Sequence, residues 1–363
     1  MKAKAAVFMG PNVPFEVREF PVTTPPAGYG RCELIASGVC GTDVHFHRGK
    51  LSIKAPTVIG HEFVGRLVEL DEAEGARYGL KKGDAVIADI AVPCGECLLC
   101  KSGDDANCVN MGVTNGGSIE EAPYLYGGYA RVNYTPLTNL VKIPEQLDPT
   151  MTAVFACPGP TALHAIRLAR QAGVEIEKCR CAVVQGLGPV GLFAVMALKA
   201  LGAEKVYAVT DRASNSRREL ALSLGADKVF AFTEGGEEAV LATLATENGG
   251  LGVDLCFEAS GAPTAVPFGM QILRNRGVYL VPGQYSNSGG IEIQPQLITF
   301  KALHIIGSSQ YSMLDVAGYL SFLEAHPELH ASILDLATTY AIEDVNRAFE
   351  DACAGRNVKT VLI

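Results

Sequence analysis

The segment that decides the fold class is CAVVQGLGPVG, which spans Cys181–Gly191. Its first five residues are mostly apolar, and its last six carry glycines in the pattern G-x-G-x-x-G. An apolar run from Leu192 to Leu201 follows. This order predicts a buried strand, a tight glycine turn and a helix whose N-terminus faces a pyrophosphate group. The segment therefore predicts a dinucleotide-binding site.

A second predicted strand, Val206–Asp211, ends in a carboxylate. Further apolar segments at residues 228–230, 253–258 and 277–281 alternate with predicted helices. Strands that alternate with helices form a doubly wound parallel sheet, so we expect an α/β unit of the Rossmann type.

Three glycines of the turn are expected to allow close approach to the pyrophosphate: Gly186, Gly188 and Gly191. Asp211 is expected to accept hydrogen bonds from the adenosine ribose, which predicts NAD rather than NADP as the cofactor. Arginine is the usual partner of a 2′-phosphate, so Arg212, with Arg217 and Arg218 nearby, opposes this prediction. We expect Arg212 to stack on the adenine edge and the other two to lie on an exposed helix face.

Four cysteines form the most specific motif of the chain, with the spacing Cys-x2-Cys-x2-Cys-x7-Cys: Cys94, Cys97, Cys100 and Cys108. Four thiolates complete a tetrahedral zinc site and leave no position for a substrate, which predicts a structural zinc ion. Ferredoxins also use closely spaced cysteines, so an iron–sulfur cluster is the alternative.

A second set of candidate metal ligands consists of Cys40 and the pair His61-Glu62. Thiolate and imidazole are ligand types that zinc prefers, and two of them leave room for a third ligand and an open position. That arrangement is typical of a catalytic zinc site. The alternative is a buried core thiol and a histidine whose hydrogen bonds are satisfied.

The segments CGTDVH, from Cys40 to His45, and GHE, from Gly60 to Glu62, resemble the zinc-dependent alcohol dehydrogenases of the medium-chain dehydrogenase/reductase superfamily. The resemblance covers essentially the whole chain. It implies a β-rich, barrel-like (GroES-like) catalytic domain at residues 1–157 with a structural-zinc lobe. A Rossmann domain at 158–306 and a return to the catalytic domain at 307–363 complete the expected organisation.

The family also implies roles for residues around the catalytic zinc. Cys157 lies where the family has the third protein ligand of the catalytic zinc. Thr42 would bind the substrate oxygen, and on a strand it would point to the same side as Cys40. His45 would relay the proton to solvent, although His47 could replace it. Glu62 is expected either to contact a zinc ligand without binding the zinc itself or to serve as an alternate ligand.

Three further residues are expected at the cofactor. Thr161 would lie beside the nicotinamide, and Val190 would pack behind it, although a valine in that helix would also be ordinary core. Lys359 matches a basic residue that contacts the pyrophosphate in the family; an exposed lysine of an end strand is the alternative.

Composition limits the possible partners. The chain has 363 residues and a net charge of −9, which argues against a nucleic-acid surface. The spacing of its 11 cysteines suits metal binding rather than disulfides, and no stretch is long and apolar enough to span a bilayer. We therefore expect a cytoplasmic protein. The resemblance implies a homodimer or homotetramer, with an exposed sheet edge near residues 277–293 as the contact.

We expect an oxidoreductase that transfers a hydride between NAD(H) and a secondary alcohol, polyol or sugar, with two zinc ions per chain. Two alternatives remain open at this point. One is a lyase or epimerase that uses transient oxidation, and the other is a non-catalytic NAD-binding relative.

Overall fold

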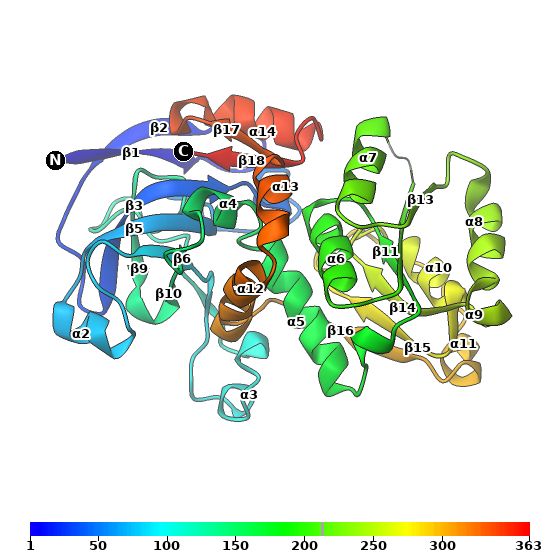
Figure 1. The fold of residues 1–363 in the computed structure, drawn as a ribbon. Helices are drawn as coiled ribbons and strands as arrows, with labels where there is room; N and C mark the ends of the chain where they lie inside the picture. Colours follow the sequence, from blue (N-terminus) through cyan, green and yellow to red (C-terminus); the bar gives the residue numbers. More distant parts are fainter. Residues whose placement is uncertain (212–213) are drawn as a thin grey trace. The chain divides into compact units, whose positions relative to one another are not determined.

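The computed structural model describes residues 1–211 and 214–363, so the expected cofactor residue Arg212 lies outside the described residues. Contacts divide the chain into two compact units (Figure 1). Unit 1 contains Met1–Pro160 and Gln310–Ile363, and unit 2 contains Thr161–Ser309. Both boundaries lie three residues beyond the expected ones at residues 157 and 306.

Unit 1 is rich in antiparallel sheet. Its largest sheet has the strand order β10-β6-β5-β3-β18-β17, with β9 paired to β3. The bounds are β10 Leu140–Lys142, β6 Ala85–Ala88, β5 Glu62–Glu69, β3 Tyr29–Gly38, β18 Lys359–Leu362, β17 Ala337–Tyr340 and β9 Val132–Pro136. The C-terminal strand β18, drawn red in Figure 1, pairs with the end of β3, where Val361 lies opposite Gly38. The last segment therefore completes the first unit.

Smaller elements surround this sheet. The strands β2 Glu16–Pro21, β1 Lys2–Phe8 and β4 Thr57–Val58 form a second sheet, and β7 Ala91–Val92 pairs with β8 Gly112–Val113. The helices are α1 Gly41–His47, α2 Glu72–Arg77, α3 Leu98–Lys101, α4 Pro149–Val154, α12 Met313–Ala325, α13 His330–Leu334 and α14 Val345–Cys353. Short 3-10 turns are η1 Asp105–Asn107, η2 Leu137–Asn139, η4 Pro327–Leu329 and η5 Ile342–Asp344.

Unit 2 is built on a parallel sheet of six strands in the order β13-β12-β11-β14-β15-β16. The bounds are β13 Lys228–Ala231, β12 Lys205–Thr210, β11 Cys181–Gln185, β14 Val253–Glu258, β15 Leu273–Val281 and β16 His304–Gly307. All five residues of β11 are buried. Chain order reverses between β11 and β14, and parallel sheets bind ligands at such a point. The predicted α/β fold class is confirmed.

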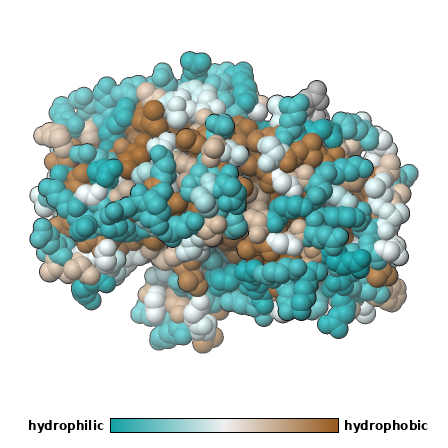
Figure 2. Space-filling view, in the orientation of Figure 1, coloured by the Kyte–Doolittle hydropathy of each residue, from teal (hydrophilic) through white to brown (hydrophobic). Residues whose placement is uncertain are grey.

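Unit 2 also contains helices, and all of them except α5, which precedes β11, connect successive strands of this sheet. They are α5 Pro158–Gln171, which begins in unit 1, α6 Pro189–Ala200, α7 Asn215–Ser223, α8 Gly236–Ala245, α9 Glu247–Gly250, α10 Ala265–Ile272 and α11 Gln296–Phe300, with the 3-10 turn η3 Ile176–Lys178. Apolar side chains are concentrated in the cores, and hydrophilic ones cover much of the face drawn in Figure 2. Within the described part of the chain, no helix combines the length and the apolar character needed to cross a membrane.

The prediction that residues near 277–293 form the exposed sheet edge is wrong. Strand β15 ends at Val281 and lies between β14 and β16, so the edge strand is β16. Pro282 and Gly283 follow β15 directly, and residues 282–295 contain no strand. Proline lacks the backbone donor that a ladder needs, which explains why the apolar pattern does not continue as strand.

Candidate active site

Cys40 begins helix α1, and the helix cap fixes its position. The backbone N–H of Cys40 donates a 3.0 Å hydrogen bond to Asp43 Oδ2, and the N–H of Asp43 donates to the carbonyl of Cys40. Thr42 therefore lies in a helix and not on a strand, because this capping pair starts the helix before Thr42. Its hydroxyl still lies 3.7 Å from Cys40 Sγ.

A glycine turn with a positive φ positions His61. Gly60 has a φ of +97°, and a Cβ at this position would lie 2.5 Å from the ring of Tyr129. His61 follows directly and is 4% exposed, with Nδ1 3.5 Å from Asp43 Oδ1. Burial opposes a charge on His61, but Asp43 and Cys40 outweigh it and hold the pKa of the imidazole well above its usual value. Asp43 therefore orients the ring through Nδ1, and Nε2 is the nitrogen that could bind a metal once it loses its proton.

Four residues bring one possible ligand atom each to within 4.8 Å of one another: Cys40, His61, Glu62 and Cys157. The two sulfur atoms are 3.9 Å apart. Thiolates on a tetrahedral zinc with Zn–S bonds of about 2.3 Å would lie ~3.8 Å apart. The spacing and the donor types of this cluster therefore fit a zinc ion.

The charges of the two thiols are unequal. The hydrogen bond with Cys157, assisted by His61 and Lys359, holds the pKa of Cys40 well below its usual range. The same hydrogen bond, together with burial, raises the pKa of Cys157. One proton is thus shared between two sulfur atoms, and a cation between them would replace that proton.

Glu62 forms a buried ion pair with Lys359, whose Nζ also donates a 3.3 Å hydrogen bond to the carbonyl of Val39. Burial raises the pKa of Glu62, against the effect of Lys359. Gly38 makes this pair possible, because a Cβ there would overlap the Glu62 carboxylate. Lys359 is 2% exposed, so the reading as an exposed end-strand lysine is wrong. Its ammonium group pairs with Glu62, which also belongs to unit 1.

The two candidate relay histidines have different surroundings. His45 is half-buried, and Cys40 is close enough to influence its pKa. Burial, followed by Lys50 and Arg48, lowers that pKa. His47 stacks on Phe15 with ring centroids 5.9 Å apart and also packs against Phe349.

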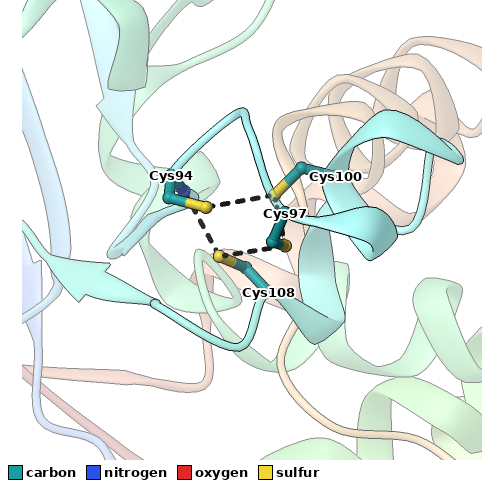
Figure 3. Close-up of side chains that lie close together, drawn as sticks. All are labelled: Cys94, Cys97, Cys100 and Cys108. Carbon is teal, nitrogen blue, oxygen red and sulfur yellow. Dashed lines mark hydrogen bonds between the residues drawn. The ribbon is translucent and has the colours of Figure 1, made fainter.

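The four cysteines of the predicted structural site converge on one loop (Figure 3). Their sulfur–sulfur distances are 3.5 Å for Cys97–Cys100 and 4.0 Å for both Cys94–Cys100 and Cys97–Cys108. These values again match the ~3.8 Å of tetrahedral zinc thiolates. Backbone hydrogen bonds, first that of Cys100, lower the pKa of Cys97 to about 6. Cys97 directly precedes helix α3, Cys100 lies in it, and Cys108 directly follows the 3-10 turn η1.

In unit 2 the glycines of the turn have distinct structural roles. Gly186 has a φ of +95°, and a Cβ on Gly191 would lie 2.0 Å from the carbonyl of Gly186. A Cβ on Gly188 would meet no atom within 4 Å, so this side of the turn is open to a ligand. Val190 lies in the first turn of α6, and Asp211 directly follows β12, which is paired with β11. The acid and the glycine turn thus lie at the same end of neighbouring strands.

Thr161, the first residue of unit 2, lies near the beginning of α5. Sequence reasoning missed Tyr129, whose hydroxyl donates a 2.8 Å hydrogen bond to Asp43 Oδ2. It also missed Tyr311, which is 2% exposed and close enough to Cys157 and Glu62 for both to influence its pKa. Neither tyrosine belongs to a local motif, so no signal in the sequence pointed to them.

Known families and proteins match the chain along most of its length. A model of the alcohol dehydrogenase GroES-like domain matches residues 31–145, and a model of zinc-binding dehydrogenases matches residues 189–325. D-xylulose reductase A of Aspergillus niger is 31% identical, over 90% of this chain and 87% of its own length. The 5-exo-hydroxycamphor dehydrogenase of Pseudomonas putida is 29% identical, over 99% and 98%. A crystal structure of an alcohol dehydrogenase from Thermotoga maritima has a TM-score of 0.90 at 29% identity and covers 100% of this chain and 99% of that one.

Proposed function

Since the chain belongs to the zinc-dependent alcohol dehydrogenases of the medium-chain dehydrogenase/reductase superfamily, we propose that it transfers a hydride between NAD(H) and an alcohol or carbonyl substrate. The observation that carries this proposal is the cluster of Cys40, His61, Glu62 and Cys157. The reacting carbon belongs to a secondary alcohol, a polyol or a sugar. The names of two relatives, a hydroxycamphor dehydrogenase and a D-xylulose reductase, support this range.

Cys40, His61 and Cys157 are the residues that would hold a catalytic zinc, with one position left open. A bound zinc would supply Lewis acidity that lowers the pKa of an alcohol hydroxyl. Both cysteines must be thiolates to bind a metal, and the lowered pKa of Cys40 favours the first deprotonation. Glu62 balances Lys359 and acts as an outer partner of the ligands or as an alternate ligand. The cysteines Cys94, Cys97, Cys100 and Cys108 would hold a structural zinc.

Thr42 and His45 remove the proton of the substrate. The Thr42 hydroxyl, 3.7 Å from Cys40 Sγ, can accept a proton from the substrate oxygen and donate its own. His45 has a lowered pKa, so its ring is neutral near neutral pH and can accept that proton. His47 is packed between phenylalanine rings and is a poorer candidate for this role.

The cofactor is NAD, which accepts or donates the hydride at its nicotinamide ring. The turn of Gly186, Gly188 and Gly191 would receive the pyrophosphate, and Asp211 the ribose hydroxyls. Val190 and Thr161 are assigned to the nicotinamide. Arg218 donates hydrogen bonds to the carbonyl of Val229 and to the carboxylate of Glu234. Its guanidinium group is therefore unavailable for a 2′-phosphate.

Arg217 is the residue that most favours NADP. It donates a 3.3 Å hydrogen bond to the carbonyl of Leu187 in the glycine turn. The effect of Asp211 on the choice of cofactor outweighs that of Arg217. Hydrogen bonds from the ribose hydroxyls to its charged carboxylate contribute about 1.5–3 kcal/mol, and a 2′-phosphate would be repelled by the same carboxylate.

The chain forms a homodimer or homotetramer through the edge of the parallel sheet. The edge strand β16 carries Ile305, which is 43% exposed, and the neighbouring helix α11 carries Phe300, which is 77% exposed. An open apolar edge is a site of association. A single monomeric species in light scattering would contradict this. The protein is cytoplasmic, because thiolate zinc sites need reduced cysteines and, within the described residues, all 11 cysteines are free.

The proposed function is tested by incubating the zinc-loaded protein and NAD with a panel of secondary alcohols, polyols and sugars. We expect NADH to form with at least one member of the panel. Conversion of a substrate without net NADH would contradict the proposal in favour of a lyase or epimerase. Binding of NAD without any conversion would contradict it in favour of a non-catalytic relative.

A further inference from the structure

Glu258 is the last residue of strand β14 and is fully buried in unit 2. In the parallel sheet it lies opposite Gln185, which ends β11 directly before the glycine turn. A glutamate is almost never fully buried unless its charge is paired. Among the described residues, however, the partners of this carboxylate are neutral N–H and O–H groups.

One oxygen of the Glu258 carboxylate holds the loop that follows β14. Oε1 accepts hydrogen bonds from the N–H of Ser260 at 2.8 Å, from the Ser260 hydroxyl at 2.6 Å and from the N–H of Gly261 at 2.9 Å. The other oxygen, Oε2, is buried and has no hydrogen-bond partner among the described residues. Burying such an oxygen costs free energy, so stability of the fold alone does not explain a glutamate at this position.

The loop that Glu258 holds packs against the glycine turn. A Cβ on Gly186 would lie 2.8 Å from the Cα and 2.9 Å from the N of Ser260. A Cβ on Gly191 would lie 3.5 Å from the Cβ of Ala259. The backbone of Ser260 therefore touches the turn that is assigned to the pyrophosphate, and a shift of this loop would disturb the turn.

The same carboxylate also borders the loop that follows β15. A Cβ on Gly283 would lie 2.4 Å from Glu258 Oε2, and the N–H of Gly283 donates a 3.0 Å hydrogen bond to the carbonyl of Glu258. A Cβ on Gly261 would lie 2.9 Å from the carbonyl oxygen of Gly283. The side chain of Gln284 donates a 3.0 Å hydrogen bond to the carbonyl of Ala262. The loops after β14 and β15 are thus joined, with the carboxylate between them.

We propose that Glu258 is a positioning residue for the nicotinamide half of the dinucleotide. This inference rests on the proposed function, which assigns the adenosine half to Asp211 after β12. A dinucleotide crosses the point where strand order reverses, so its second half lies over the loops after β14 and β15. Glu258 touches neither half of the cofactor. It fixes the backbone of Ser260 and Gly261 on which the nicotinamide half rests.

Two variants and one matched control test this proposal. Glu258→Gln keeps the size of the side chain and removes its charge, which weakens the three hydrogen bonds to the loop. Gly283→Ala leaves the glutamate in place but adds a methyl group 2.4 Å from Oε2. Gly290→Ala is the control, because a methyl group there meets no atom within 4 Å. Isothermal titration measures the Kd of each protein for NAD and for 5′-AMP, which contains the adenosine half alone.

We expect Glu258→Gln and Gly283→Ala to bind NAD about tenfold more weakly than wild type, with an affinity for 5′-AMP within about twofold of wild type. Gly290→Ala should match wild type with both ligands. General destabilisation of unit 2 would weaken both ligands together, so the difference between them identifies a positioning role.

Unchanged NAD affinity in Glu258→Gln, or an equal loss of affinity for NAD and 5′-AMP, would overturn the inference. If Glu258→Gln does not fold, Gly283→Ala decides by the same two measurements. Failure of the proposed function is recognised in the wild-type protein, which would then bind neither ligand. If wild type binds both ligands and the two variants equal it, only the role of Glu258 is wrong.

Discussion

The hydroxyl of Tyr129 donates a 2.8 Å hydrogen bond to Asp43 Oδ2, and both side chains are fully buried. The other carboxylate oxygen of Asp43 lies 3.5 Å from Nδ1 of His61. A tyrosine thus holds the carboxylate, and the carboxylate faces the histidine that we propose as a metal ligand. Outer partners of this kind set the direction and basicity of the ligand that they contact.

The first prediction concerns Asp43. Asp43→Asn keeps the shape of the side chain but removes the charge that faces His61. Zinc affinity of the catalytic site should fall by about 10- to 100-fold. Competition with a chelator measures this, and the four-cysteine site should retain its metal. An unchanged affinity would mean that Asp43 serves only as the cap of α1.

The second prediction concerns the four-cysteine lobe. Cys97→Ser should lower the melting temperature more than the activity per folded molecule, because structural zinc contributes to folding directly. Cys353→Ser is the matched control, since Cys353 is also half-buried and belongs to neither ligand cluster. Calorimetry of both variants decides the matter. Equal melting temperatures for Cys97→Ser and wild type would show that this site has no structural role.

The third prediction concerns the proton relay. The pKa of His45 lies below its usual value, so the residue is a base at neutral pH and becomes protonated only at lower pH. His45→Gln should reduce kcat by about 10- to 100-fold near neutral pH and much less at high pH, where solvent takes the proton. Rate profiles over pH for His45→Gln and His47→Gln test this. A uniform loss across pH would indicate a structural role, and a larger effect of His47→Gln would move the relay there.

The fourth prediction concerns the choice of cofactor. Wild type should have a higher kcat/KM with NAD than with NADP, by about 10- to 100-fold. Asp211→Gly should shift the ratio toward NADP, because it removes both the ribose acceptor and the repulsion of a 2′-phosphate. Steady-state kinetics with both cofactors measures the ratio. A ratio that does not change in the variant would show that Asp211 does not contact the ribose.

Local patterns were sufficient to predict much of the fold. The strand, glycine turn and helix around Gly186 are contiguous in sequence. Their geometry follows from the burial of the apolar strand β11 and from the positive φ that glycine allows at position 186. The four cysteines of the lobe are also close in sequence, so their spacing alone predicts convergence. The wrong edge strand arose because Ile291 and Ile293 resemble strand residues, while Pro282 and Gly283 had already ended β15.

Contacts between distant segments could not be predicted in the same way. Tyr129 and Tyr311 reach the ligand cluster from segments far from Cys40, and only tertiary packing places them there. Lys359 was expected at a pyrophosphate, whereas the pairing of β18 with β3 brings its ammonium group to Glu62. Thr42 was interpreted with strand geometry, because the cap formed by Cys40 and Asp43 was not recognised in the sequence.

The central claim is that Cys40, His61 and Cys157 form a catalytic zinc site separate from the four-cysteine lobe. Elemental analysis of wild type and Cys157→Ser tests it most directly. We predict two zinc ions per chain in wild type, and one zinc ion with loss of turnover in Cys157→Ser. One zinc ion in wild type, or a Cys157→Ser protein with unchanged zinc content and activity, would contradict the account.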